Sequence, residues 1–211
     1  MYRFSTMHVE QTQILTRGEL ARVLTHGQQN AQRSANAWRN LIIVRLACCC
    51  GLRVSEIAGL QLDDVVVDIP RPHLRLRHCT KGGRPRSVPL WWDAGTLGDL
   101  TAWKSERLKQ GASGDDPFIC SVQAHRHGQP LQRHAIRRRC LSACWVLGRA
   151  RMRTLTIHHG RHTFVSHALA GGRSLAEVQA AAGHSNASVT SAYLHIIVDD
   201  VEPIGNLFRY D

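Results

Sequence analysis

A short strand pattern in an otherwise helical sequence limits the possible folds more than any other feature. Three consecutive valines lie within Asp64–Asp68, and residues 73–78 alternate polar and apolar side chains with the period of two of a half-buried strand. Residues 81–85, Lys-Gly-Gly-Arg-Pro, have the composition of a turn, and a third short strand is expected at Arg86–Leu90. These segments predict a small three-stranded antiparallel sheet within an α+β, mainly α-helical fold.

Helix-start signals flank the sheet on both sides. Thr16 and Glu19 form the pattern of a capping box, in which each side chain bonds the backbone N–H group of the other. Ser174 and Glu177 repeat this pattern before a helix that should stop at Gly183. Further helices are expected at residues 35–50, 53–59, 96–110, 131–147, 159–170 and 186–195.

The charge balance indicates the kind of partner. The 211 residues include 27 Lys and Arg against 16 Asp and Glu, which gives a net charge of +11 with neutral histidines. Guanidinium groups bind phosphates in bidentate fashion and stay charged at any working pH. This balance is typical of a nucleic-acid binder, but taken alone it fits a merely basic soluble protein equally well. The run Arg137-Arg138-Arg139 fits either a face that follows phosphates or a solvated helix face.

The cysteines and apolar segments indicate neither export nor metal binding. Three of the seven cysteines, Cys48–Cys50, lie in an apolar run, where thiols usually act as small core residues in a reducing compartment. Cys140 and Cys144 are one helical turn apart but have no second ligand pair nearby, so no zinc site is expected. The longest apolar run, Leu41–Leu52, is interrupted by Arg45 and is too short to span a bilayer. We expect a cytoplasmic protein without a metal or other cofactor.

Four short segments combine residue types that suit chemistry on a phosphodiester. They are Gly51-Leu52-Arg53-Val54-Ser55-Glu56, Thr80-Lys81-Gly82-Gly83, His158-His159-Gly160-Arg161-His162-Thr163-Phe164, and Gly183-His184 with Tyr193 nine residues further on. Two guanidinium groups can neutralise the phosphodiester and hold the charge of a pentavalent transition state. A tyrosine has a pKa near 10, so a neighbouring histidine could take its proton or, alternatively, hydrogen-bond the phosphate. A lysine on a turn can protonate the leaving oxygen, which is help worth about 10²–10⁴ in rate.

Other chemistries lack their residues. His158 and His162 have the i, i+4 spacing of a zinc site, but the glutamate of an HExxH zinc hydrolase is missing. The glycine pattern of an ATP-binding P-loop is also missing. Taken singly, Arg53 could form a surface salt bridge, Lys81 could be an ordinary turn lysine, and Tyr193 could be a packing residue. Only their combination favours catalysis.

In this order and with these gaps, the four segments resemble those of the tyrosine recombinase (phage integrase) family. That family has an Arg in a GLRxSE helix, a Lys in a β-turn before an R-x-VPL strand, His-x-x-Arg followed by His-Thr-Phe, and a Gly-His nine residues before a Tyr. The resemblance covers residues 15–195. It implies that Arg53 and Arg161 clamp the scissile phosphate, that Lys81 is the general acid, that His158 and His184 assist, and that Tyr193 is the nucleophile.

The resemblance also implies a reaction and its partners. A member cleaves and rejoins double-stranded DNA at specific sites through a 3′-phosphotyrosine, without metal or ATP, as a homo-multimer such as a tetramer on paired sites. Type IB topoisomerases use the same chemistry, but the spacing of His184 and Tyr193 favours recombination. Further DNA contacts are expected from Arg84, Arg86, Arg137, Arg138 and Arg139.

Two features depart from the family's pattern. Gly160 stands where the family usually has Leu, and glycine costs a helix about 1 kcal/mol relative to Ala, less at the helix entrance. Residues 1–14 are expected to be a flexible segment in place of a helical core-binding domain. The chain thus resembles minimal members such as the fimbrial phase-variation recombinases, with an excised domain or a decayed gene as the alternatives. A DNA-binding accessory protein of the same fold therefore stays open as a second interpretation. The tail, residues 196–211, is expected to dock on a neighbouring subunit.

Overall fold

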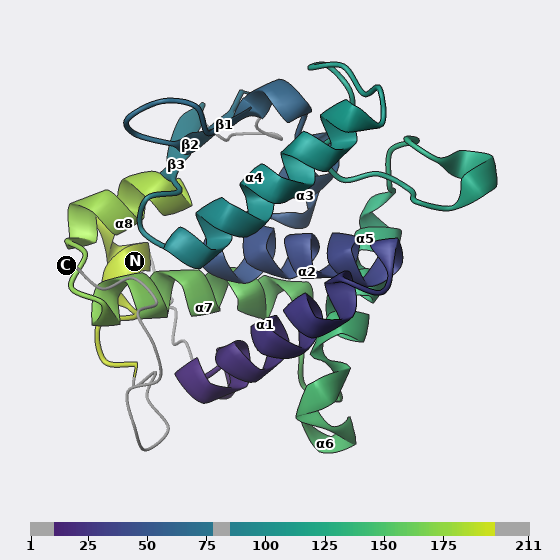
Figure 1. Cartoon of the computed structure of the whole chain (residues 1–211). Helices are drawn as coiled ribbons and strands as arrows, with labels where there is room; N and C mark the ends of the chain where they lie inside the picture. Colours follow the sequence, from purple (N-terminus) through teal and green to yellow (C-terminus); the bar gives the residue numbers. More distant parts are fainter. Residues whose placement is uncertain (1–10, 78–84, 197–211) are drawn as a thin grey trace.

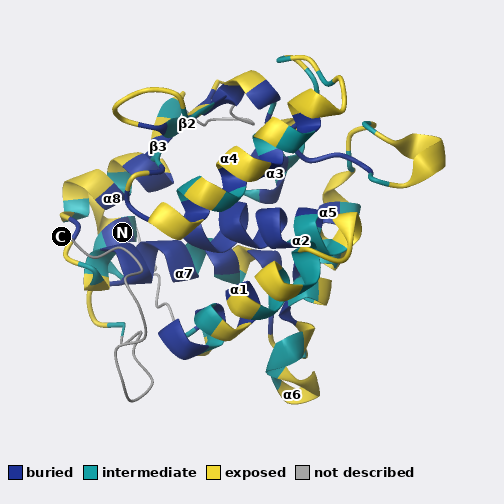
Figure 2. Ribbon diagram, in the orientation of Figure 1, coloured by how far each residue is buried: buried dark blue, intermediate teal, exposed yellow. Residues whose placement is uncertain are grey.

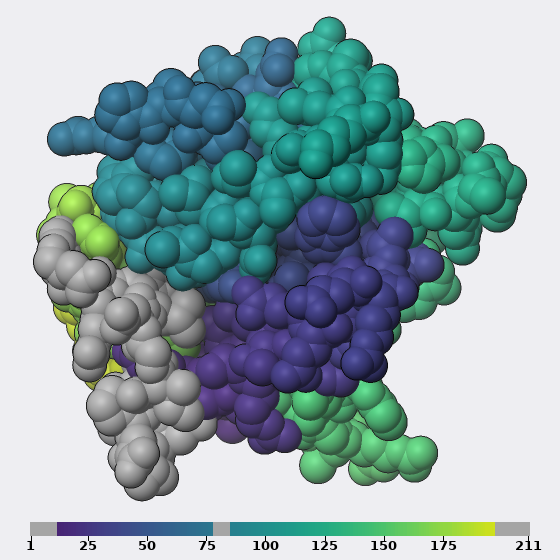
Figure 3. All heavy atoms as spheres, viewed as in Figure 1, coloured from purple at the N-terminus to yellow at the C-terminus, as the bar shows by residue number. Residues whose placement is uncertain are grey.

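Two helices lie at the centre of the fold, α2 (Ala35–Val44) and α7 (Ile157–Ala170) (Figure 1). The computed structural model describes residues 11–77 and 85–196. The C-terminal half of α2 and most of α7 are buried, as their dark blue colour in Figure 2 shows. On the face seen in Figure 3, residues of α1 (Arg17–Ala31) and α4 (Ala94–Lys109) cover this centre. No described helix has the length and apolar character needed to cross a membrane.

Helix α1 begins at the capping box that the sequence predicts. The Thr16 side chain accepts a hydrogen bond from the N–H group of Glu19 at 3.2 Å, and the Glu19 carboxylate accepts one from the N–H group of Thr16 at 3.1 Å. Gln11–Gln13 form the 3-10 helix η1 and Ile14 is fully buried, so residues 11–14 belong to the fold, contrary to our expectation of a flexible segment. Residues 1–10 lie outside the described residues.

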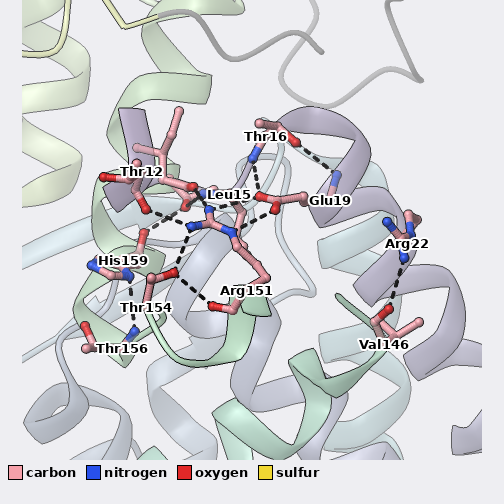
Figure 4. Close-up of polar contacts among 12 residues, drawn as sticks. Thr12, Leu15, Thr16, Glu19, Arg22, Val146, Arg151, Thr154, Thr156 and His159 are labelled. Carbon is pink, nitrogen blue, oxygen red and sulfur yellow. Dashed lines mark hydrogen bonds and ion pairs between the residues drawn. The ribbon is translucent and has the colours of Figure 1, made fainter. Parts of the chain in front are cut away.

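An arginine holds the chain before α1 against the rest of the molecule. Arg151, in the short helix α6 (Arg149–Met152), pairs with Glu19 at 2.7 Å and donates to the backbone carbonyls of Thr12 and Ile14 (Figure 4). Because Ile14 carries no side-chain donor or acceptor, the burial of its side chain is apolar, while the backbone carbonyls of Thr12 and Ile14 are satisfied by this guanidinium.

Helix α2 continues directly into a five-residue π-helix, η2 (Arg45–Cys49), so the predicted helix at 35–50 is confirmed with a wider last turn. Cys48–Cys50 are buried and free, as predicted. Helix α7 packs closely on η2: a Cβ on Gly160 would lie 2.9 Å from the Cβ of Ala47 and 3.0 Å from its carbonyl group. The departure from Leu at position 160 therefore has a steric reason, because Ala47 occupies the space.

The three strands form the predicted antiparallel sheet in the order β1-β2-β3. They are β1 (Val65–Val66), β2 (His73–Leu76) and β3 (Arg86–Pro89). Leu74 pairs with Val65 on one side and with Val88 on the other, and all three side chains are fully buried. The short helix α3 (Val54–Gly59) and the 3-10 helix η3 (Leu62–Asp64) precede the sheet.

The second half of the chain is helical, with two corrections. The predicted helix at 131–147 divides into α5 (Arg133–Ala143) and the 3-10 helix η5 (Cys144–Leu147), and η4 (Ala124–Arg126) precedes it. Helix α8 (Leu175–Ala182) follows the predicted capping box and ends at Gly183. Helix α9 (Ala187–Ser191) is shorter than predicted, so Tyr193 lies in the turn after it, where its N–H group bonds the carbonyl of Thr190 at 3.2 Å.

Candidate active site

The chain between η2 and α3 places Arg53 at the start of a helix. Gly51 has a φ of +65°, and a Cβ there would lie 2.4 Å from the ring of Phe164, so only glycine fits. Arg53 is the N-cap residue of α3, and its side chain is 40% exposed, with the guanidinium 3.2 Å from the carboxylate of Glu56. The sharp bend also directs the Gly51 carbonyl toward α7, where it accepts a hydrogen bond from Arg161 at 3.0 Å.

Arg161 lies in the first turns of α7 and is held by backbone carbonyls. Besides Gly51, the Ala182 carbonyl at the end of α8 accepts a hydrogen bond from its guanidinium. Among the described residues Arg161 forms no ion pair. Burial, then the positive charges of Arg53 and Arg86, lower the pKa of Arg161 to about 10 against the opposing charge of Glu56, so it remains a cation at neutral pH.

Glu56 joins the first arginine to the sheet. Its buried carboxylate accepts hydrogen bonds from Arg86 at 2.6 and 3.0 Å and from the backbone N–H group of Arg53 at 2.7 Å. Burial opposes ionisation of Glu56, but the hydrogen bonds and charge of Arg86, helped by Arg53, hold its pKa below the ordinary value. The Arg86 side chain is only 7% exposed and also bonds the Ala181 carbonyl. It therefore faces the protein, not a DNA surface as we expected.

Tyr193 is held by a histidine to which the sequence analysis assigned no role. The hydroxyl of Tyr193 lies 2.6 Å from Nδ1 of His162, and the two ring centroids are 5.7 Å apart. Tyr193 is 3% exposed, and burial raises the pKa of its hydroxyl above the ordinary value, partly opposed by the charge of Arg161. Burial, together with the charges of His159, His158 and Arg161, lowers the pKa of His162 to about 4, so this imidazole is neutral at physiological pH.

A second histidine, His184, lies beside the ring of Tyr193. Gly183 ends α8 in the left-handed conformation, with a φ of +67°, and so directs His184 back toward the site. The rings of His184 and Tyr193 are 6.4 Å apart and nearly parallel, and Nδ1 of His184 contacts the hydroxyl of Thr190 at 2.9 Å. Burial, with the charges of Arg161 and other nearby cations, lowers the pKa of His184 to about 4.

The first two histidines of α7 are placed differently. His158 is exposed, in the first turn of the helix. Nδ1 of His159 accepts a hydrogen bond from the backbone N–H group of Thr156 at 3.1 Å and so caps the helix (Figure 4). Neither His158 nor His159 forms a described contact with Tyr193, so the structure brings Arg161, His162 and His184 to the tyrosine.

The remaining predicted residues lie away from this group or outside the described residues. Lys81 and Arg84 fall in residues 78–84, which the structure does not describe. On α5, Arg137 and Arg138 are exposed, whereas Arg139 is half-buried. The described residues contain no cluster of histidine, cysteine and carboxylate groups that could hold a metal ion.

Sequence reasoning missed two members of the site, His162 and Glu56. Both stand inside the quoted motifs, but the pairing of His162 with Tyr193 spans 31 residues and arises only when the turn after α9 packs on α7. Glu56 carried a signal that could have found it: a carboxylate three residues after Arg53 suits the capping position of a short helix.

The chain belongs to the phage integrase family, whose sequence model matches residues 13–198. It is 35% identical over 155 residues to tyrosine recombinase XerC of Chromobacterium violaceum. The aligned region covers 74% of this chain and 47% of that relative. It is 31% identical over 178 residues to tyrosine recombinase XerD of Staphylococcus aureus strain Mu50. This alignment covers 82% of this chain and 56% of that relative. The chain thus spans about half the length of these relatives.

Solved structures share the fold. The XerA recombinase superposes with a TM-score of 0.69 at 21% identity, covering 93% of this chain and 61% of that one. The XerH site-specific recombinase, in a pre-cleavage complex with its difH substrate, gives 0.69 at 21% identity over 93% of this chain and 54% of that one. A lambda integrase dimer bound to a core site gives 0.61 at 17% identity over 90% of this chain and 50% of that one. The α+β architecture with three short strands is therefore the tyrosine recombinase catalytic fold.

Proposed function

We propose that this chain is a site-specific DNA recombinase that cleaves double-stranded DNA with Tyr193 and rejoins it. The tyrosine oxygen attacks the scissile phosphorus, a bond forms between them, and the bond from phosphorus to the 5′ oxygen breaks. The product is a 3′-phosphotyrosine and a free 5′ hydroxyl. The covalent bond conserves the energy of the phosphodiester, so rejoining needs no ATP.

One observation carries this proposal: Arg161 is a half-buried cation without a carboxylate partner among the described residues, beside the buried hydroxyl of Tyr193. Such a group gains most from an incoming anion, because its desolvation is not yet offset by a counter-charge. Arg53 is near enough to lower the pKa of Arg161, so one phosphate could neutralise both. That arrangement would also hold the charge of the transition state.

Other parts of the proposal rest on sequence and on relatives. Lys81 would protonate the leaving 5′ oxygen, with His158 and His184 assisting at the phosphate. Exposed Arg137 and Arg138 on α5 would contact DNA phosphates, and Arg84 remains a candidate. Both DNA-bound structural neighbours support duplex DNA as the partner. We further propose a homo-multimer on paired sites, in the cytoplasm, with residues 196–211 docking on a neighbouring subunit.

The test is covalent capture of DNA. A pool of duplexes with randomised sequence around a nick is incubated with the protein, so that cleavage near the nick releases a short fragment and traps the adduct. Denaturing electrophoresis should show an adduct with the wild type and none with Tyr193→Phe. Tyr210→Phe is the matched control and should form the adduct. The absence of an adduct from the wild type, or its persistence in Tyr193→Phe, would contradict the proposal and favour a DNA-binding accessory protein.

A further inference from the structure

His162 is the described side chain that contacts the reacting oxygen of Tyr193 directly, at 2.6 Å. His184 stacks near the tyrosine ring, but its Nδ1 is engaged with Thr190. His158, to which the family pattern assigns an assisting role, is exposed at the start of α7. The residue that removes the proton of Tyr193 is therefore inferred from its contact with the hydroxyl and not from its position in the family's motif.

We infer that Nδ1 of His162 accepts the proton of Tyr193 as the tyrosine oxygen attacks phosphorus, an inference that rests on the proposed function. The tautomer required has its hydrogen on Nε2 and the Nδ1 lone pair facing the hydroxyl. In the forward step the O–H bond of Tyr193 breaks as its O–P bond forms, and a protonated amine, Lys81 in our proposal, supplies the proton to the leaving 5′ oxygen. On rejoining, His162 returns its proton to the departing tyrosine oxygen.

The surroundings of His162 make this acceptance depend on bound DNA. The charged and titratable groups around it are His158, His159 and Arg161 on its own helix, and Tyr193 and His184 from the elements packed against α7. Without DNA, burial and the nearby positive charges disfavour a positive charge on the His162 ring. A phosphate bound at Arg161 would offset that charge and raise the pKa of His162. A bound phosphate would therefore favour proton acceptance by His162.

Two substitutions separate proton acceptance from positioning. The Oδ1 atom of Asn can occupy the place of Nδ1 and accept the hydrogen bond, but it cannot take a proton at neutral pH, whereas Ala removes both. We expect His162→Asn and His162→Ala each to slow adduct formation at pH 7 by about 10²–10⁴, the usual contribution of a general base. In both variants the rate should then rise about tenfold per pH unit toward pH 10, as the tyrosine ionises unaided.

The matched control is His159→Asn, on the same helix, with a ring 6.3 Å from that of His162 and no described contact with Tyr193. It should change the rate by less than about threefold, an effect under 1 kcal/mol. Thermal melting of each variant checks the fold. His162→Asn at the wild-type rate, or a loss in both variants with no recovery at high pH, would overturn the inference. Failure of the wild type to form any adduct would instead overturn the proposed function.

Discussion

Two arginines in neighbouring parts of the fold are buried in opposite ways. Arg45, in the π-helix η2, is 4% exposed and contacts Asp93 at 3.3 Å and Asp99 at 2.8 Å. Burial alone would lower the pKa of Arg45, but Cys49 and the two carboxylates outweigh it and raise the pKa above its ordinary value. Arg161 is held by the carbonyls of Gly51 and Ala182, and its pKa is lowered to about 10.

The difference distinguishes a structural charge from one that awaits a ligand. The charge of Arg45 is neutralised by two carboxylates inside the protein, so it can attract little else. Carbonyl oxygens orient the Arg161 guanidinium without neutralising it, and the nearby positive charge of Arg53 leaves the region short of anions. An arginine of the second kind is poised for phosphate.

The largest expected effect tests the structural arginine. Arg45→Met should lower the free energy of unfolding by about 3–5 kcal/mol, because it leaves the carboxylates of Asp93 and Asp99 without their cation. Urea unfolding measures it. Arg22→Met, which removes one exposed bond to the Val146 carbonyl, is the control and should cost less than about 0.5 kcal/mol. If Arg45→Met lowered the free energy of unfolding as little as Arg22→Met does, the proposed difference between Arg45 and Arg161 would be wrong.

The second prediction tests the arginine of the site. Arg161→Met should slow adduct formation by about 10²–10³, as the loss of one donor to a transition-state oxyanion usually does. Its free energy of unfolding should fall much less than in Arg45→Met, because no carboxylate loses a partner and repulsion from Arg53 is relieved. Both quantities are measured on one preparation. Equal destabilisation by the two substitutions would show that Arg161 also serves the fold.

Glu56 provides a sharper intermediate case, because it neutralises Arg86 and also contacts Arg53. Glu56→Gln should cost about 2 kcal/mol of unfolding free energy, since hydrogen bonds to charged groups contribute roughly 1.5–3 kcal/mol and Arg86 stays buried. Asp115→Asn, at an exposed side chain, should be nearly neutral in the same urea titration. If Glu56→Gln and Asp115→Asn change the free energy of unfolding equally, the negative charge of Glu56 does not hold Arg86 and Arg53 in place.

The smallest effect is a dependence on acid. His162 and His184 have pKa values of about 4 in the folded chain, against 6.5 when unfolded. Between these values the unfolded chain binds protons that the folded chain excludes, so stability is full above pH 6.5 and falls toward pH 4. Because both rings are partly exposed, about 1 kcal/mol each is a fair discounted size. Melting temperatures measured from pH 7.5 to 4.5 should therefore fall less steeply in His184→Asn than in the wild type, and an equally steep fall would contradict the prediction.

Local patterns predicted the elements well, because capping and alternation are encoded within a few residues. The capping boxes at Thr16 and Ser174 and the three antiparallel strands follow from such patterns. Alternation could also have placed Arg86 correctly, since it lies two residues from buried Val88 on the same strand and therefore shares its face. The resemblance to the tyrosine recombinase motifs further implied that Arg161, His184 and Tyr193 would belong to one site.

What the sequence could not supply depends on contacts between distant segments. The π-helix has no distinctive composition, and it forms where Arg45 reaches the carboxylates at the start of α4. The contact of His162 with Tyr193 needs α9 to end early, so that the turn after it returns to α7. Neither event has a periodicity that a local pattern could reveal.

The close contact between Gly160 and Ala47 restricts how this site can change over evolutionary time. A side chain at position 160 would meet Ala47, so an enlarging substitution at either position would force α7 and η2 to move apart. Arg161 and His162 are the next two residues along the same rigid helix. A shift of α7 would therefore displace Arg161, the proposed phosphate ligand, together with His162, which contacts the tyrosine. Evolution could not adjust one of these two functions without altering the other.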